Sequence, residues 1–167
     1  GGLIGTARPS PGARNKGRTR RALSSKRHPY SARARAGEVH LRVLETTDLH
    51  GNLLAYDYYT DRPDPAIGMV QVARLIDSAR AEAENAVLFD NGDYLEGTPL
   101  ADMVAQGRGL TTGEVHPVIA AMNALGVEAA TLGNHEFNYG LPFLRQAIAG
   151  AAFPVVSANL ATALGDT

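Results

Sequence analysis

The sequence contains no cysteine, which excludes a disulfide framework, thiol catalysis and cysteine-ligated metal sites, although it leaves the compartment open. It also has no run of about 18 apolar residues, so we predict no transmembrane helix. The rest of the composition is ordinary: 44% of the 167 residues are hydrophobic and 20% are charged. These proportions indicate about one globular domain.

Acidic residues are absent from positions 1–37, which hold ten of the 16 Lys and Arg residues. Positions 38–167 hold six basic residues against all 17 acidic ones, so the formal charge is +10 in the first part and −11 in the second. The first part also has too few large apolar residues to offset its ordering entropy. We therefore predict a basic disordered head, 1–37, followed by a folded part, 38–167.

The head has no apolar segment of about 7–15 residues, so no export signal is visible in it. One interpretation is a nucleic-acid-binding arm, because clustered cations release counterions when they bind phosphates. The other is a solvated tail, or a stretch upstream of the true start. Tyr30 is the only aromatic residue of the head, so stacking on single strands is poorly supported and we favour the second interpretation.

Strands and helices alternate along the folded part, which predicts an α/β fold with a largely parallel sheet. The patterns place strands at 40–47, 86–90, 127–132 and 153–157, and helices at 68–84, 100–106, 114–125 and 141–149. Ligands of such sheets bind at the carboxyl ends of the strands. Three polar clusters follow the first three strands: Asp48-Leu-His50, Asn91-Gly-Asp93 and Gly133-Asn-His-Glu136.

These clusters have the composition of a metal site. Asp48 and His50 would face one side of an extended segment, because positions i and i+2 share a side. Asp93 adds a second carboxylate, Asn134 an amide oxygen and His135 a second imidazole. Mixed oxygen and imidazole ligands suit zinc, manganese, iron or nickel. Two such ions about 3.5–4 Å apart could clamp the oxygens of an in-line displacement at phosphorus.

Each cluster taken alone is common in turns and helix caps. Their joint occurrence, each directly after an apolar strand, favours a shared site over those explanations. Two smaller expectations accompany this one. His116, beside Pro117, is expected at a helix boundary, and the aromatic cluster of Tyr56, Tyr58 and Tyr59 could either stack on a base or cover the sheet edge.

The motifs also resemble a known family. Asp48-Leu-His-Gly-Asn52, Asn91-Gly-Asp93 and Gly133-Asn-His-Glu136 are similar to those of the calcineurin-like metallophosphoesterases of the 5′-nucleotidase group. Gly97-Thr-Pro-Leu-Ala-Asp102 and Tyr56-Asp-Tyr-Tyr59 narrow the resemblance to the subgroup that hydrolyses 2′,3′-cyclic nucleotides and 3′-nucleotides. The resemblance extends from about residue 41 to 159.

The resemblance implies paired sheets flanked by helices, two divalent ions such as zinc or manganese, and a nucleotide substrate. In the family, Asp48 and His50 would ligate the first ion, Asp93 would bridge both, and Asn134 would ligate the second. His135 would be catalytic: it would face the phosphate and assist the leaving oxygen. Relatives act in the periplasm or at the cell surface, and the resemblance implies that location here.

Two departures from the family pattern modify these expectations. Relatives that act on 5′-nucleotides carry Asp three residues after the catalytic histidine, where this chain has Asn138, which favours the cyclic-nucleotide subgroup. No histidine follows His135, although the family uses further histidine ligands and a base-binding domain. We therefore expect the front half of a catalytic domain, inactive by itself, with incompletely covered apolar side chains at Val87, Leu88, Val127 and Leu132.

Three alternatives stay open from the sequence. Two lie within the enzyme class, namely a 5′-nucleotidase-type phosphatase and a sulfur-ester relative. The third is a nucleic-acid-binding module that acts through the basic head.

Overall fold

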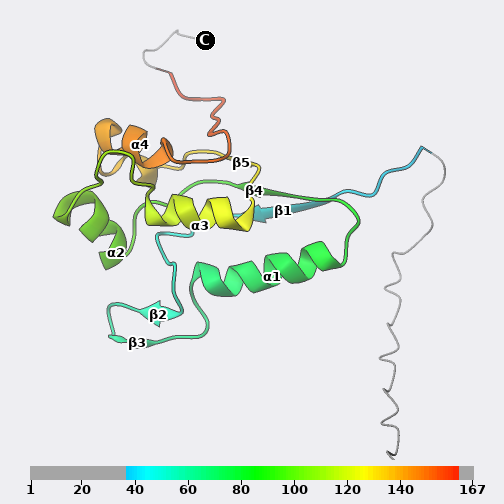
Figure 1. Cartoon of the computed structure of the whole chain (residues 1–167), viewed down its shortest axis with the longest axis horizontal. Coiled ribbons are helices and arrows are strands. Elements are labelled where there is room, and N and C mark those ends of the chain that lie inside the picture. The colour runs from blue at the N-terminus through cyan, green and yellow to red at the C-terminus, as the bar shows by residue number, and fades with distance from the viewer. Residues whose placement is uncertain (1–36, 162–167) are drawn as a thin grey trace, which may run out of the picture. The chain divides into compact units, whose positions relative to one another are not determined.

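The computed structural model describes residues 37–161. The predicted basic head therefore lies outside the described residues, except for its last position. Within the described range the predicted alternation of strands and helices is confirmed, and a parallel three-stranded sheet in the order β1-β4-β5 forms the centre of the fold (Figure 1). Its strands are β1 (Arg42–Thr46), β4 (Ala86–Asp90) and β5 (Ala129–Ala130).

Three helices pack on this sheet. They are α1 (Met69–Ala81), α3 (Pro117–Leu125) and α4 (Leu141–Ile148). Leu88 of β4 lies in one buried cluster with Ile76 of α1, Met122 of α3 and Leu144 of α4. The helices therefore cover the sheet face that carries Leu88, and their apolar spacing in the sequence is explained by this burial.

The structure corrects several of the predicted boundaries. The helix expected at 114–125 begins at Pro117, because the His116 imidazole accepts a hydrogen bond from the Val118 N–H and caps its start. The helix expected at 100–106 divides into α2 (Pro99–Asp102) and a π-helical turn, Met103–Gly107.

The strand content also differs from the prediction. The strand expected at 153–157 is a single parallel bridge between Ala130 and Val155, and β5 itself has only two residues. The loop after β1, expected to be irregular, contains a small antiparallel ribbon of β2 (Tyr56–Asp57) and β3 (Arg62–Pro63). Short elements of this kind carry too few residues to show a period in the sequence.

The expected exposure of apolar side chains is partly wrong. Leu88 and Val127 are buried in the core cluster that the helices share, while Val87 and Leu132 are partly buried. The side chains left in solvent lie on the other face instead: Val43 is 60% exposed and Phe89 is 39% exposed.

The register of the sheet positions the site. Thr46 pairs with Asp90 and Asp90 pairs with Ala130, so the three strands end at the same level. The loops that leave these ends are the three polar clusters found in the sequence, and they consequently meet at one edge of the sheet.

Candidate metal centre

The loops after β1 and β4 continue to pair beyond the strands. The Asp48 N–H donates to the Gly92 carbonyl at 3.0 Å, and the His50 N–H donates to the Asp93 carbonyl at 2.9 Å. These backbone hydrogen bonds hold the first two clusters side by side, independently of their side chains.

Three of the predicted ligands converge. Asp48, His50 and Asp93 each offer one ligand atom, and these atoms all lie within 4.8 Å of one another. The His50 Nε2 is 3.6 Å from an Asp48 carboxylate oxygen. Asp48 is exposed, whereas His50 and Asp93 are partly buried, so the group opens to solvent on one side. Two carboxylates and one imidazole in this arrangement can hold a divalent cation of the zinc or manganese type.

The backbone at these residues corrects the expected extended segment. Asp48, His50 and Asp93 have φ values of 53°, 47° and 59°, all in the left-handed region. Asp48 and His50 share a side of the loop because each turns the chain sharply. Such conformations cost of order 1–3 kcal/mol each and cluster at functional sites. In the described chain the only other non-glycine residue with positive φ is Asp61.

Two glycines allow the second and third clusters to touch. A Cβ added to Gly92 would lie 2.3 Å from the Gly133 nitrogen, and one added to Gly133 would lie 2.1 Å from an Asp93 carboxylate oxygen. Any side chain at Gly133 would therefore occupy the space of the Asp93 carboxylate. Gly92 and Gly133 are therefore required for this close backbone approach.

Glu136 joins the same two loops from within. It is fully buried, and its carboxylate accepts four backbone N–H bonds, from Asp93, Tyr94, Leu95 and Gly133, at 2.7–3.1 Å. One oxygen binds Tyr94 and Leu95 and the other binds Asp93 and Gly133. Glu136 belongs to the third polar cluster of the sequence, but this role was not predicted, because nothing in the local spacing shows which N–H groups will surround it.

His50 is held through its other ring nitrogen. Its Nδ1 lies 3.0 Å from the Glu96 carbonyl oxygen. A carbonyl can only accept, so Nδ1 carries the proton and Nε2 presents its lone pair to the site. Histidine ligands of metals are oriented by partners of this kind.

His135 lies directly beside the group. Its backbone N–H donates to the Asp93 carboxylate at 2.9 Å, and its ring meets the His50 ring edge-on at 5.2 Å between centroids. Its Nδ1 is 3.0 Å from the Asn138 side-chain nitrogen and 3.0 Å from a Glu96 carboxylate oxygen. The Glu96 contact was not predicted. Asn134, the remaining predicted ligand, is exposed in the same loop, one residue before the short helix His135–Phe137.

Behind the site, Asp90 closes the end of β4. Its carboxylate accepts the Thr46 hydroxyl at 2.6 Å and the Gly92 N–H at 3.0 Å. Burial raises the pKa of Asp90, and these two hydrogen bonds oppose the rise. Asp90 therefore supports the turn that carries Asp93.

The aromatic cluster lies beside the rim of the site. Tyr59 is 77% exposed, and its hydroxyl lies 3.4 Å from the Gly97 carbonyl, next to Glu96. Tyr56 hydrogen-bonds to Asp61 and meets Tyr58 edge-on. The exposure of Tyr59 leaves its ring available for stacking.

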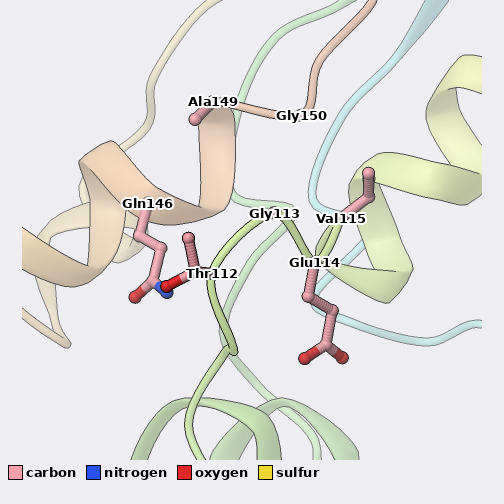
Figure 2. A pocket seen from close by; sticks show the side chains of 7 residues that line it. All are labelled: Thr112, Gly113, Glu114, Val115, Gln146, Ala149 and Gly150. Carbon is pink, nitrogen blue, oxygen red and sulfur yellow. The ribbon is translucent and has the colours of Figure 1, made fainter.

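A pocket of about 260 Å³ lies elsewhere (Figure 2). It is formed by the loop 112–115 and the carboxyl end of α4, and none of the candidate ligands lines it. Glu114 at its edge is held by Arg108, whose guanidinium, together with hydrogen bonds from Thr111, lowers the pKa of Glu114 to about 2. This anchoring explains the shape of the loop without a ligand.

The chain is similar to several known proteins. No protein-family model matches the chain. It is 54% identical over 127 residues to the 2′,3′-cyclic-nucleotide 2′-phosphodiesterase/3′-nucleotidase of Yersinia enterocolitica, a match that covers 76% of this chain and 19% of that protein. It is 44% identical over 140 residues to the trifunctional nucleotide phosphoesterase protein YfkN of Bacillus subtilis, covering 82% of this chain and 10% of that protein.

Solved structures share the fold. The calcineurin-like phosphoesterase YfkN from Bacillus subtilis superposes with a TM-score of 0.68 at 45% identity, over 71% of this chain and 36% of that one. A putative 5′-nucleotidase from Staphylococcus aureus superposes with a TM-score of 0.61 at 30% identity, over 71% of this chain and 22% of that one. The chain thus belongs to the calcineurin-like phosphoesterases of the 5′-nucleotidase group. It spans about a fifth of the length of its cyclic-nucleotide relative from Yersinia enterocolitica.

Proposed function

We propose that the protein to which this chain contributes hydrolyses phosphoester bonds in 2′,3′-cyclic nucleotides and 3′-nucleotides. The observation that carries the proposal is the convergence of Asp48, His50 and Asp93 ligand atoms within 4.8 Å at the strand ends. The 54% identity to a relative named for these two activities supports this substrate class over 5′-nucleotides.

The fold implies divalent metal ions, and the donor set fits them. We assign Asp48 and His50 to a first ion, Asp93 as a bridge, and Asn134 to a second ion, both of the zinc or manganese type. Bound there, the ions would neutralise charge on the phosphoryl group and activate water for attack. The fixed Nδ1 of His50 suits this assignment, because it leaves Nε2 free to ligate.

His135 is the residue that we assign to the leaving group. Its ring lies against His50, and its backbone is tied to Asp93, so it is adjacent to the proposed metal ligands. A proton held at its Nε2 would stabilise the charge that develops on the phosphoryl oxygens and pass to the leaving oxygen as the ester bond breaks. Transfers of this kind typically contribute about 10²–10⁴-fold in rate.

The proposal is tested with the complete protein that contains this chain, assayed against 2′,3′-cyclic AMP, 3′-AMP and 5′-AMP. We expect the first two to be hydrolysed at least about tenfold faster than 5′-AMP. Asp93→Asn should abolish turnover and reduce the zinc or manganese bound in calorimetry, whereas Asp77→Asn, an exposed change on α1, should do neither. Preferential hydrolysis of 5′-AMP would replace this proposal with the 5′-nucleotidase alternative.

We propose action in the periplasm or at the cell surface, which fractionation of the source cells tests. In the described part of the chain, no helix has both the length and the apolar character to cross a membrane.

The nucleic-acid alternative predicts that deleting 1–37 removes a salt-dependent affinity for RNA or DNA, while Asp93→Asn leaves that affinity intact.

A further inference from the structure

Glu96 contacts both imidazoles of the site, through different atoms. Its backbone carbonyl lies 3.0 Å from the His50 Nδ1, and its carboxylate lies 3.0 Å from the His135 Nδ1. No other residue described in the structure joins the two rings in this way. Glu96 is therefore more than a solvated charge in a loop, because it contacts both rings of the site.

The backbone around Glu96 is held rigidly. Gly97, with φ of 124°, lies against the His50 ring so closely that an added Cβ would be 2.8 Å from the His50 Cβ. Thr98 is buried, and its hydroxyl both donates to the Gly51 carbonyl and caps the start of α2. Anchors on both sides of the turn thus limit the positions that the Glu96 carboxylate can take.

A carboxylate at this position selects one form of the histidine. A carboxylate oxygen can only accept, so it pairs with Nδ1–H and orients the ring; when Nε2 carries a proton as well, that nitrogen is the one that can pass its proton to the leaving oxygen. The Asn138 side-chain nitrogen lies 3.0 Å from the same Nδ1, but this nitrogen is a donor and cannot accept from Nδ1–H, so of the two contacts only the Glu96 carboxylate can accept that hydrogen bond.

We propose that Glu96 is a positioning residue for His135, because its carboxylate lies 3.0 Å from the His135 Nδ1 and can hold the ring in one orientation. The proposal rests on the proposed function, since it concerns the histidine assigned to the leaving group. It does not make Glu96 a metal ligand: the described group of acidic and imidazole ligands is Asp48, His50 and Asp93.

The test moves the carboxylate that contacts the His135 ring from position 96 to position 138. In the complete protein we compare Glu96→Ala, Glu96→Gln and the double variant Glu96→Ala/Asn138→Asp. Glu96→Ala should lower kcat on 2′,3′-cyclic AMP about 10- to 100-fold, part of the contribution of a general acid, with KM changed less than about threefold. Glu96→Gln keeps an acceptor for Nδ1–H without the charge and should fall between Glu96→Ala and the wild type.

The double variant is the decisive measurement. Asn138→Asp returns a carboxylate to the His135 Nδ1 from the other side, so it should recover most of the kcat lost in Glu96→Ala. Glu84→Ala, an exposed change after α1, is the matched control and should leave kcat unchanged. The ¹⁵N shifts of the His135 ring in metal-free protein provide a readout without turnover: the Nδ1–H form should decline in Glu96→Ala and return in the double variant.

The outcomes separate this inference from the function on which it rests. A wild-type protein without phosphoesterase activity refutes the proposed function, while the ¹⁵N shifts still test the pairing. An active wild type whose Glu96→Ala variant keeps more than half of kcat refutes the positioning role. A change confined to KM, loss of bound metal in Glu96→Ala, or failure of Asn138→Asp to restore kcat would also overturn it.

Discussion

The buried carboxylate of Glu136 joins two loops of the candidate site. Its two carboxylate oxygens accept four N–H hydrogen bonds, three from the loop after β4 and one from the loop after β5. Both loops would otherwise bury unpaired N–H groups, each of which costs about 1–3 kcal/mol. The carboxylate therefore fixes the distance between the turn that carries Asp93 and the turn that carries His135.

Glu136→Gln should destabilise the fold and loosen the site. Glutamine offers one oxygen and one NH₂ group, so one pair of N–H donors would face another donor. We expect a loss of about 2–4 kcal/mol in the free energy of unfolding, measured by urea denaturation. Gln106→Glu, an exposed exchange of the same two side chain types in the turn Met103–Gly107, is the control. A change below about 0.5 kcal/mol in Glu136→Gln would contradict the assignment.

His116 gives a pH-dependent prediction. It is buried, its Nδ1 accepts the Val118 N–H, and its ring meets Phe143 edge-on. Burial first, and then the positive charge of Arg108, lowers the pKa of His116 to about 4, while Glu114 opposes the shift. The folded protein thus keeps this imidazole neutral at a pH where the unfolded chain protonates it near 6.5.

The stability contributed by neutral His116 should therefore be complete above pH 6.5 and decline as the pH falls toward 4. The shift corresponds to about 3 kcal/mol. His116→Asn keeps a capping side chain without a titrating ring, so its unfolding free energy should vary less over this range than that of the wild type. His40→Asn, at an exposed position, should leave the slope unchanged. Equal slopes in wild type and His116→Asn would refute the prediction.

At the scale of single residues, the sequence predicted which candidate ligands would converge, but it did not predict the residues that hold them in place. The convergence of Asp48, His50 and Asp93 could be predicted because each follows an apolar strand, and parallel strands end at one edge. Their left-handed backbone was not predicted, since neither Asp nor His requires it. Glu96 and Glu136 were missed because their partners are backbone groups and rings that only the folded chain brings near.

At the scale of secondary-structure elements, a side chain of one helix caps the end of another. Arg80, in the last turn of α1, donates to the Leu125 carbonyl at 2.5 Å and to the Gly126 carbonyl at 3.0 Å, at the carboxyl end of α3. Gly126 ends that helix in the left-handed conformation, which glycine adopts without a steric penalty. A cation at this end also interacts favourably with the helix dipole.

Arg80→Met should consequently weaken the contact between the two helices. The methionine keeps much of the apolar stem but leaves two carbonyls without the guanidinium. We expect a loss of about 1–2 kcal/mol in the free energy of unfolding, measured in urea at fixed pH. Arg74→Met, on the same helix but with a contact only to Gln71, should change it by less than about 0.5 kcal/mol. Equal effects of the two changes would exclude capping as the cause.

Long elements were predicted more accurately than short ones. The period of α1 and the apolar run of β4 extend over enough residues to be recognised, and both were located within a few residues. β5 and the bridge at Val155 depend on pairing with β4 and β5 respectively, so their limits are decided by tertiary contacts. The start of α3 depends on the His116 cap, which the sequence did indicate as a boundary.

At the scale of the whole described fold, the sheet has two unlike faces. The face with Leu88 is covered by helices, whereas the opposite face presents Leu41, Val43 and Phe89, which are 56%, 60% and 39% exposed. The register places Val43 beside Val87 and Glu45 beside Phe89, so these apolar groups lie on adjacent strands. β1 is also an edge strand, and exposed apolar edges favour association between chains.

The chain produced by itself should therefore self-associate through this face. Val43→Thr combined with Phe89→Thr keeps residues suited to strands while it removes apolar surface, so the double variant should stay monomeric at concentrations where the wild type forms larger species. Sedimentation velocity over a range of protein concentrations measures this. The control is Leu75→Gln, since Leu75 is 71% exposed on α1 but lies outside the sheet. If Leu75→Gln reduced association as much as the double variant did, general surface hydrophobicity rather than the open sheet face would be responsible.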